Sequence, residues 1–339
     1  MKAGIIGLGH GERVLLHAFN HSGIEVHGIS SKNFNKAKKI GKLYKISNIY
    51  KSWKNLIKNK DIDIVAIAIP APYQIEIIIE CIKKNKLILS EKPIGTNINK
   101  IDNLFKILEK YKKFFLIDYI FPEHNAFKKF KETLSKQKTY KEDSVSIFFN
   151  LKNISNKNNK MKWKSQPNLG GGLINLYLSH IVDYLVQFFG SISKVECKIK
   201  KRGKIEKDLN CLFTFNNGLR AEIVISKNSI KNYHAIKYYS KKFNLFLINN
   251  SNDYCKGFKI KYFKKNFTEK GSIKEILYKN NFKLFNGDSR IILSSKIIDK
   301  FKTTKKIINL SSNIERYKYN EYVLNKCRIS SKKTLVQRL

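Results

Sequence analysis

The first 120 residues alternate short β-branched runs with helical segments, and this alternation leaves few folds open. Strand-like runs at residues 3–8, 24–30 and 62–69 are each followed by a helical pattern. From Ile64 the third run is continuously apolar until Pro70, Ala71 and Pro72 end it, which is typical of a strand buried on both faces. We therefore predict βαβ units and a parallel sheet over residues 1–120.

The rest of the chain has a different pattern. Strand-like runs follow one another between residues 145 and 263, several of them joined by turn residues such as Asn216, Asn217 and Gly218. The clear helical segments are 173–189, 290–302 and 315–327. This order predicts an α+β domain with a large, mostly antiparallel open sheet. We expect three parts: an α/β domain over 1–120, the α+β domain over 121–312, and a C-terminal helix and tail over 313–339.

The composition narrows the classes of partner. Lys and Arg number 67 and Asp and Glu 26, so the net charge is +41, but only seven of the basic residues are Arg. Nucleic-acid-binding proteins favour Arg, whose planar fork pairs with phosphates and base edges, so we interpret the charge as a Lys-rich surface and disfavour nucleic acid. No apolar run is long enough to predict a membrane span. The five scattered cysteines predict no metal site and reduced thiols in a cytoplasm.

A glycine-rich loop follows the first predicted strand and precedes a helix. Gly7 permits a tight turn, and Gly9 lets backbone N–H groups approach a pyrophosphate at the helix N-terminus. The usual third glycine is replaced by Glu12, with Gly11 one place early and Arg13 one place later. We interpret the loop as a dinucleotide site rather than an incidental turn.

The end of the second strand bears on the choice of cofactor. An NAD-binding protein usually carries an acid there for the ribose hydroxyl, but this chain has Ser30, Ser31, Lys32 and Asn33. Ser31 and Lys32 suit a 2′-phosphate. We therefore expect NADP, with NAD left open.

Three further segments carry a family resemblance. The first is Pro70 to Pro72, and the second is Glu91, Lys92 and Pro93, after the next predicted strand. The third is a run of three glycines that begins at Gly170. Trp163 precedes these glycines, and His180 and Asp183 follow them. With the loop, they resemble the glucose-fructose oxidoreductase and inositol dehydrogenase (Gfo/Idh/MocA) family. The resemblance implies an N-terminal Rossmann domain, a C-terminal domain with an open sheet, and a substrate held between them. It also implies an NAD(P)-dependent oxidoreductase of sugars or related alcohols and carbonyls, with homo-oligomers formed through the open sheet face.

The same resemblance implies a role for each matching residue. Lys92 and His180 are the predicted catalytic residues, with Lys92 exchanging the substrate hydroxyl proton. The predicted cofactor contacts are Gly7, Gly9, Gly11, Arg13, Ser31, Lys32, Pro70, Pro72 and Glu91. The predicted substrate contacts are Tyr119, Trp163, Asn175 and Asp183. The Lys92–Pro93 peptide bond is predicted to be cis.

One departure from the family pattern concerns the acid that many members carry one helical turn before the histidine. That position here is Leu176, and on an α-helix Asn175 points about 100° away from it. The loss puts inositol-type chemistry in doubt. We keep two alternatives to a sugar or nucleotide-sugar oxidoreductase. One is a glycosidase-like or lyase enzyme that retains its NAD, and the other is a non-catalytic NADP-binding regulator.

The three glycines also leave two interpretations open. Their N–H groups at a helix N-terminus suit a substrate phosphate or carboxylate. Alternatively, the absence of side chains lets the helix pack closely against its surroundings.

Overall fold

The computed structural model describes residues 1–111, 114–137, 142–152, 163–253, 255–264, 273–277, 288–303 and 310–336. The chain divides into two compact units. The first unit comprises Met1–Ile120, Asn168–Gly170 and Phe285–Glu321, and the second comprises Phe121–Pro167, Gly171–Leu284 and Tyr322–Leu339. Segments far apart in the sequence therefore belong to the same unit.

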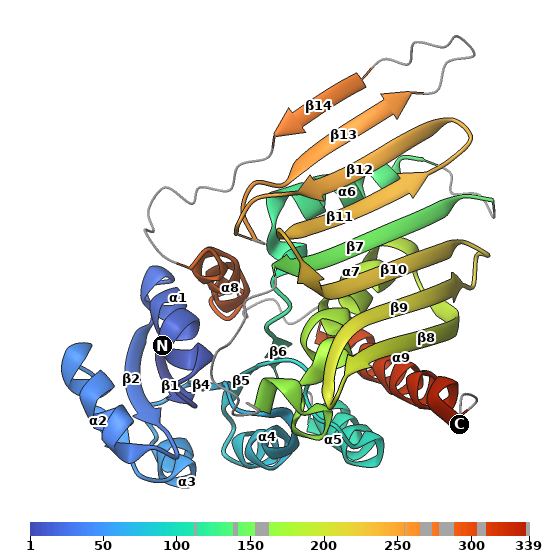
Figure 1. The fold of residues 1–339 in the computed structure, drawn as a ribbon. Coiled ribbons are helices and arrows are strands. Elements are labelled where there is room, and N and C mark those ends of the chain that lie inside the picture. The colour runs from blue at the N-terminus through green and yellow to red at the C-terminus, as the bar shows by residue number, and fades with distance from the viewer. Residues whose placement is uncertain are drawn as a thin grey trace. The chain divides into compact units, whose positions relative to one another are not determined.

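The first unit contains a six-stranded parallel sheet in the order β3-β2-β1-β4-β5-β6 (Figure 1). Its strands are β1 (Lys2–Ile6), β2 (Glu25–Ser30), β3 (Asn48–Tyr50), β4 (Ile64–Ile67), β5 (Leu87–Ser90) and β6 (Phe115–Ile117). The predicted parallel sheet is confirmed, and the short strand β3 was not expected. The strand order reverses between β1 and β4, and dinucleotides bind at such a switch point, beyond the carboxyl ends of the strands.

Helices cover both faces of this sheet. They are η1 (Gly11–Leu15), α1 (Leu16–His21), α2 (Phe34–Leu43), α3 (Trp53–Lys58), η2 (Ala71–Tyr73), α4 (Gln74–Lys83), α5 (Ile98–Tyr111) and α8 (Arg290–Asp299). The side chains of Asn33 and Ser52 accept hydrogen bonds from the first turns of α2 and α3, which fixes where these helices begin. Buried aliphatic side chains of β4, α4 and α5 form much of the core.

The second unit contains an eight-stranded sheet in the order β14-β13-β12-β11-β7-β10-β9-β8. Its strands are β7 (Ser144–Lys152), β8 (Ile192–Arg202), β9 (Ile205–Phe215), β10 (Arg220–Ser229), β11 (Tyr233–Tyr239), β12 (Phe243–Asn249), β13 (Lys259–Lys264) and β14 (Ile273–Leu277). Among the described strands of this sheet, only β7 and β10 pair in parallel. The mostly antiparallel sheet is confirmed, and β14 was not expected.

The helices of the second half include one that the sequence analysis missed. They are η3 (Phe121–Glu123), α6 (Asn125–Ser135), η4 (Trp163–Ser165), η5 (Pro167–Leu169), η6 (Ile174–Leu178), α7 (Ser179–Phe189) and α9 (Leu310–Val336). The missed helix is α6. It buries Phe127, Phe130 and Leu134 on one face, and its many Lys residues hide that periodicity.

One helical stretch among the described residues, Pro167–Phe189, is long and apolar enough to cross a membrane by length and composition alone. Buried residues make up 72% of its apolar window. The core helix of a globular domain has the same property, so this stretch is weak evidence for a membrane span.

Candidate active site at the carboxyl edge of the parallel sheet

The glycine loop lies at the carboxyl end of β1, where the strand order reverses. Gly7 has a φ of +96°, and a Cβ there would lie 2.4 Å from the carbonyl oxygen of Ala68, just beyond β4. Its N–H donates to the carbonyl of Ser30 at the end of β2. Only glycine combines this backbone conformation with so close an approach. The loops that follow β1 and β4 therefore pack directly against each other.

Gly9 and Gly11 have different surroundings. No described atom lies within 4 Å of a Cβ built at Gly9, whereas a Cβ at Gly11 would lie 2.8 Å from Cγ2 of Ile5. Gly11 thus permits the close packing of helix on strand that the third glycine of the usual pattern provides. The side chain of Glu12 forms an ion pair with Lys36 at 2.7 Å, and the same amine donates to the carbonyl of Leu8. The early glycine is therefore a shifted form of the usual pattern.

The other residues predicted to contact the cofactor lie near this loop. Arg13 donates from Nε to the carbonyl of Gly9 at 3.2 Å. Ser31 accepts a hydrogen bond from the N–H of Asn33, and Lys32 is exposed. Pro70 directly precedes η2, and Pro72 lies within it. This arrangement is compatible with the predicted cofactor contacts, which stay predictions.

The segment that carries Lys92 is held at several points beyond the end of β5. The hydroxyl of Ser90 donates to Oε1 of Gln74 at 2.6 Å, and the N–H of Glu91 donates to the carbonyl of Ile67. The N–H of Ile94 donates to Oε1 of Glu321 at 3.0 Å. The Lys92–Pro93 bond is cis, as predicted, and Lys92 is half-buried. These bonds hold the backbone on both sides of Lys92 in place.

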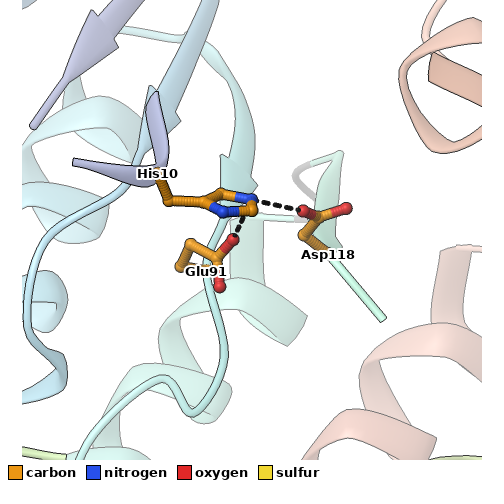
Figure 2. Close-up of side chains that lie close together, drawn as sticks. All are labelled: His10, Glu91 and Asp118. Carbon is orange, nitrogen blue, oxygen red and sulfur yellow. Dashed lines mark hydrogen bonds and ion pairs between the residues drawn. The ribbon is translucent and has the colours of Figure 1, made fainter. Parts of the chain in front are cut away.

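Three side chains from different strand ends meet at this edge of the sheet. Figure 2 shows the ring of His10, from the glycine loop, between the carboxylates of Glu91 and Asp118. Nε2 of His10 lies 2.7 Å from Oε1 of Glu91 and 3.4 Å from Oδ2 of Asp118. The hydroxyl of Ser294 donates to that same Asp118 oxygen at 3.0 Å. His10 therefore links the glycine loop to the segment that carries Lys92.

The charges in this cluster determine its protonation. Burial works against a charged imidazole, but the charge on Glu91 and the hydrogen bonds to both carboxylates raise the pKa of His10 to about 9. Burial also opposes ionisation of Glu91, yet the nearby His10 lowers the pKa of this carboxyl to about 2. Burial raises the pKa of Asp118, and the charge on Glu91 adds to that effect. Near neutral pH the cluster is therefore an imidazolium paired with at least one carboxylate.

The same three residues have the chemistry of metal ligands. Their candidate ligand atoms all lie within 4.8 Å of one another. A divalent cation binds neutral imidazole, so it would have to displace a proton whose pKa is about 9. Arg290, at the start of α8, further lowers the pKa of Glu91 and is itself hydrogen-bonded to Asp288 at 2.7 Å. These cations favour the ion-paired form of the cluster over a metal site.

The predicted substrate residues are buried to different extents. Tyr119 in the first unit is buried, with its ring against Tyr317. In the second unit, Trp163 is 38% exposed and Asp183 is buried, where it accepts a hydrogen bond from Gln187. The ring of His180 packs edge-on against Phe121, with centroids 5.1 Å apart. The catalytic and substrate roles of these residues stay predictions.

Asn175 lies in a segment wound differently from the α-helix assumed for it. Residues Ile174–Leu178 form a π-helix, in which the turn closes over five residues instead of four. The angle of 100° that separates Asn175 from Leu176 on an α-helix therefore does not apply here. The amide of Asn175 donates to the carbonyl of Gly171 at 2.7 Å and accepts from Arg328 at 2.8 Å. Protein groups thus engage both ends of this amide.

The three glycines before η6 pack closely, as one of the two interpretations expected. A Cβ at Gly170 would lie 2.7 Å from that of Ala71, and one at Gly171 would lie 2.4 Å from the carbonyl oxygen of Trp163. The N–H of Leu173 donates at 2.6 Å to a carboxylate oxygen of Glu206, a buried residue of β9. Of the three glycine N–H groups that the other interpretation reserved for a substrate anion, that of Gly171 donates to the carbonyl of Gln166 at 2.9 Å.

Sequence reasoning missed His10, Asp118, Lys36 and Glu206 as contributors to these sites. A usable signal existed for two of them: His10 lies inside the glycine loop, and Asp118 directly follows a strand of a parallel sheet. The partners of Lys36 and Glu206 depend on which elements become neighbours. No local pattern encodes that information.

Two family descriptions match this chain. Residues 1–119 match the oxidoreductase family with an NAD-binding Rossmann fold, and residues 144–245 match the GFO/IDH/MocA C-terminal domain. The chain belongs to the Gfo/Idh/MocA family. Membership confirms the predicted fold class, the oxidoreductase class and a nicotinamide dinucleotide as the type of cofactor.

Curated relatives match only part of the chain. The protein named uncharacterized oxidoreductase sll0816, from Synechocystis, is 24% identical over 191 residues, which are 56% of this chain and 52% of that protein. Trans-1,2-dihydrobenzene-1,2-diol dehydrogenase from Xenopus tropicalis is 27% identical over 92 residues, 27% of this chain and 28% of that protein. The chain thus spans about half, or less, of the length of these relatives.

Solved structures match the fold over almost the whole chain. A levoglucosan dehydrogenase in complex with NADH and L-sorbose superposes with a TM-score of 0.81 at 15% identity, covering 98% of this chain and 97% of that one. KijD10, a 3-ketoreductase from Actinomadura kijaniata in complex with NADP and TDP-benzene, gives 0.79 at 16% identity, covering 97% of each chain. At these identities the likeness shows the fold alone.

Proposed function

We propose that this protein transfers a hydride between NAD(P) and a carbon of a sugar or sugar-like alcohol or carbonyl. One observation carries the proposal: the glycine loop and the Lys92 segment lie at the carboxyl ends of β1 and β5, on one edge of a sheet whose order reverses between β1 and β4. The names of the two structural neighbours, one bound to L-sorbose and one to a TDP-linked ligand, support a sugar or nucleotide-sugar substrate.

The residues of this chain fit a dinucleotide. The open space at Gly9 and the N–H groups that begin η1 suit a pyrophosphate, which the helix N-terminus attracts. A bound nicotinamide would supply or accept the hydride. The residues that hold it in our proposal are the predicted cofactor contacts, together with Lys36, whose amine already touches the glycine loop.

Lys92 is the proposed acid and base in this scheme. Its amine would exchange a proton with the substrate oxygen as the hydride moves, which is a task for a positioned amine. His10 and Glu91 would act as positioning residues, because their ion pair holds the start of the Lys92 segment against the glycine loop. We propose that His180 assists at the substrate oxygen, as the family resemblance implies.

The cofactor in our proposal is NADP in preference to NAD. The turn after β2 offers the hydroxyl of Ser31 and the exposed amine of Lys32 and has no acid to bind a ribose hydroxyl. A positive charge at this position favours a 2′-phosphate.

The test is a panel of free sugars and nucleotide sugars, assayed in both directions by the absorbance of the reduced cofactor. With an active substrate, Lys92→Met should lower kcat by about 100-fold or more, while cofactor affinity changes by less than about twofold. Lys84→Met, at an exposed lysine after α4, is the matched control and should leave both constants unchanged. Unchanged turnover in Lys92→Met would contradict the role of Lys92.

Other outcomes would select the alternatives. Cofactor that binds without any absorbance change across the panel would favour a non-catalytic regulator. Cofactor that co-purifies, and that supports bond cleavage without being replenished, would favour the glycosidase-like alternative. Formation of homo-oligomers and a cytoplasmic location stay predictions, the first of which sedimentation velocity can test.

A further inference from the structure

Three of the five cysteines come together in the second unit, although the sequence scatters them. Cys197 of β8 lies directly opposite Cys211 of β9 in the strand register. Their sulfur atoms are 2.8 Å apart, and both side chains are buried. Cys327 of α9 forms a further hydrogen bond with Cys197. None of the three forms a disulfide in the structure.

The backbone around Cys197 shows which kind of cross-strand pair this is. The N–H of Cys197 donates to the hydroxyl of Ser330 on α9, at 3.0 Å, so it points away from β9. Cys197 and Cys211 are therefore a non-hydrogen-bonded pair, the narrow type in which opposite Cα atoms lie about 4.5 Å apart. Disulfides join Cα atoms about 4.4–6.8 Å apart, so the strands already stand at a distance that a disulfide can span.

The distance between the two sulfur atoms argues for a dithiol over a metal site. Two thiolates on one tetrahedral zinc, with Zn–S bonds of about 2.3 Å, lie roughly 3.8 Å apart. The observed 2.8 Å is well short of that separation.

The two thiols differ in pKa. Hydrogen bonds from Cys211 and then Cys327 lower the pKa of Cys197 to about 5, whereas burial raises the pKa of Cys211 well above its ordinary value. Both cysteines line a hollow of about 1000 Å³, which Lys198 and Lys326 also line. A thiolate beside a protonated thiol, at the wall of a hollow, is the arrangement that attacks an oxidant and is then resolved.

We propose that Cys197 and Cys211 form a dithiol that a peroxide oxidises to an intramolecular disulfide. The Cys197 thiolate attacks one peroxide oxygen; the O–O bond breaks, the other oxygen leaves as water or an alcohol after taking a proton, and Cys197 becomes a sulfenic acid. The sulfur of Cys211 then displaces hydroxide from Cys197, and hydroxide leaves as water with the Cys211 proton. Two thiols are oxidised and one peroxide is reduced. The hydride chemistry proposed above takes no part in this reaction.

The test treats the full-length reduced protein with hydrogen peroxide, alkylates the remaining thiols, and maps the products by mass spectrometry. We expect loss of two alkylation sites and a cross-linked peptide that joins Cys197 to Cys211. In Cys211→Ser, the sulfenic acid on Cys197 should persist and react with dimedone. Before oxidation, Cys197 should be alkylated on the order of 10-fold faster than Cys81, a buried lone cysteine of α4.

The control is Cys81→Ser, which should form the same cross-link as the unchanged protein. Three results would overturn the proposal: a cross-link from Cys197 to Cys327, irreversible over-oxidation of Cys197 with Cys211 still reduced, or stoichiometric zinc released from the purified protein by a thiol reagent. Because no assay here uses NAD(P), failure of the proposal is distinguishable from failure of the proposed function.

Discussion

Replacing His10 by Gln tests whether the His10, Glu91 and Asp118 cluster stabilises the first unit as a charged network. The pKa of His10 rises from 6.5 to about 9 because the two carboxylates outweigh the effect of burial. A raised pKa in the folded state means that the stabilisation is fully present below pH 6.5 and is lost as the pH rises through about 9. At ~1.4 kcal/mol for each pH unit between these values, the network contributes about 3 kcal/mol. Only 19% of the His10 side chain is exposed, so little of this is screened by solvent.

The measurement is the free energy of unfolding of both proteins between pH 6 and pH 10. The chain has two tryptophans, Trp53 in the first unit and Trp163 in the second, so a Trp163→Phe background lets Trp53 fluorescence report on the first unit. The difference between the two proteins should be largest below pH 6.5 and shrink as the pH passes 9. In melting temperature it corresponds to about 6–12 °C.

The control for this series is His21→Gln, at an exposed histidine of α1, which should follow the unchanged protein at every pH. Stability curves for His10→Gln and the unchanged protein that run parallel from pH 6 to pH 10 would refute the assignment of an imidazolium to this cluster.

Three further predictions concern the binding residues. Gly9→Ala should weaken cofactor binding about 10-fold or more without changing the melting temperature. Gly7→Ala should destabilise the fold itself by about 1–3 kcal/mol, because the backbone of Gly7 has a positive φ and Ala68 leaves no room for a Cβ. Equal changes in melting temperature for the two variants would contradict these separate roles. Lys32→Glu should lower the preference for NADP over NAD by about 10-fold, measured as the ratio of the two kcat/KM values, and an unchanged ratio would remove Lys32 from the cofactor site. Glu206→Gln should lower the melting temperature, since the N–H of Leu173 loses a charged acceptor worth about 1 kcal/mol. An unchanged melting temperature would contradict this role of Glu206.

The sequence alone was sufficient for the parts of this protein that local patterns encode. The continuous apolar run that begins at Ile64, the glycines around Gly9 and the segment around Lys92 each specify their own backbone through a few neighbouring residues. The parallel sheet and the tight turn at Gly7 follow from such patterns, and the structure confirms both. The helix α6 was missed even so, because its periodic phenylalanines are set among lysines.

Only the tertiary structure determined which distant residues meet. His10, Glu91 and Asp118 come from the ends of three strands, and the order β1-β4-β5-β6 brings those ends to one edge. Cys197 faces Cys211 because the β8–β9 register places them opposite each other. Sheet order and register result from burying apolar side chains along the whole chain, and a shift of one residue turns every side chain of a strand to the other face. The ion-paired cluster and the cysteine pair depend on the sheet order and register of the whole chain and not on any short segment.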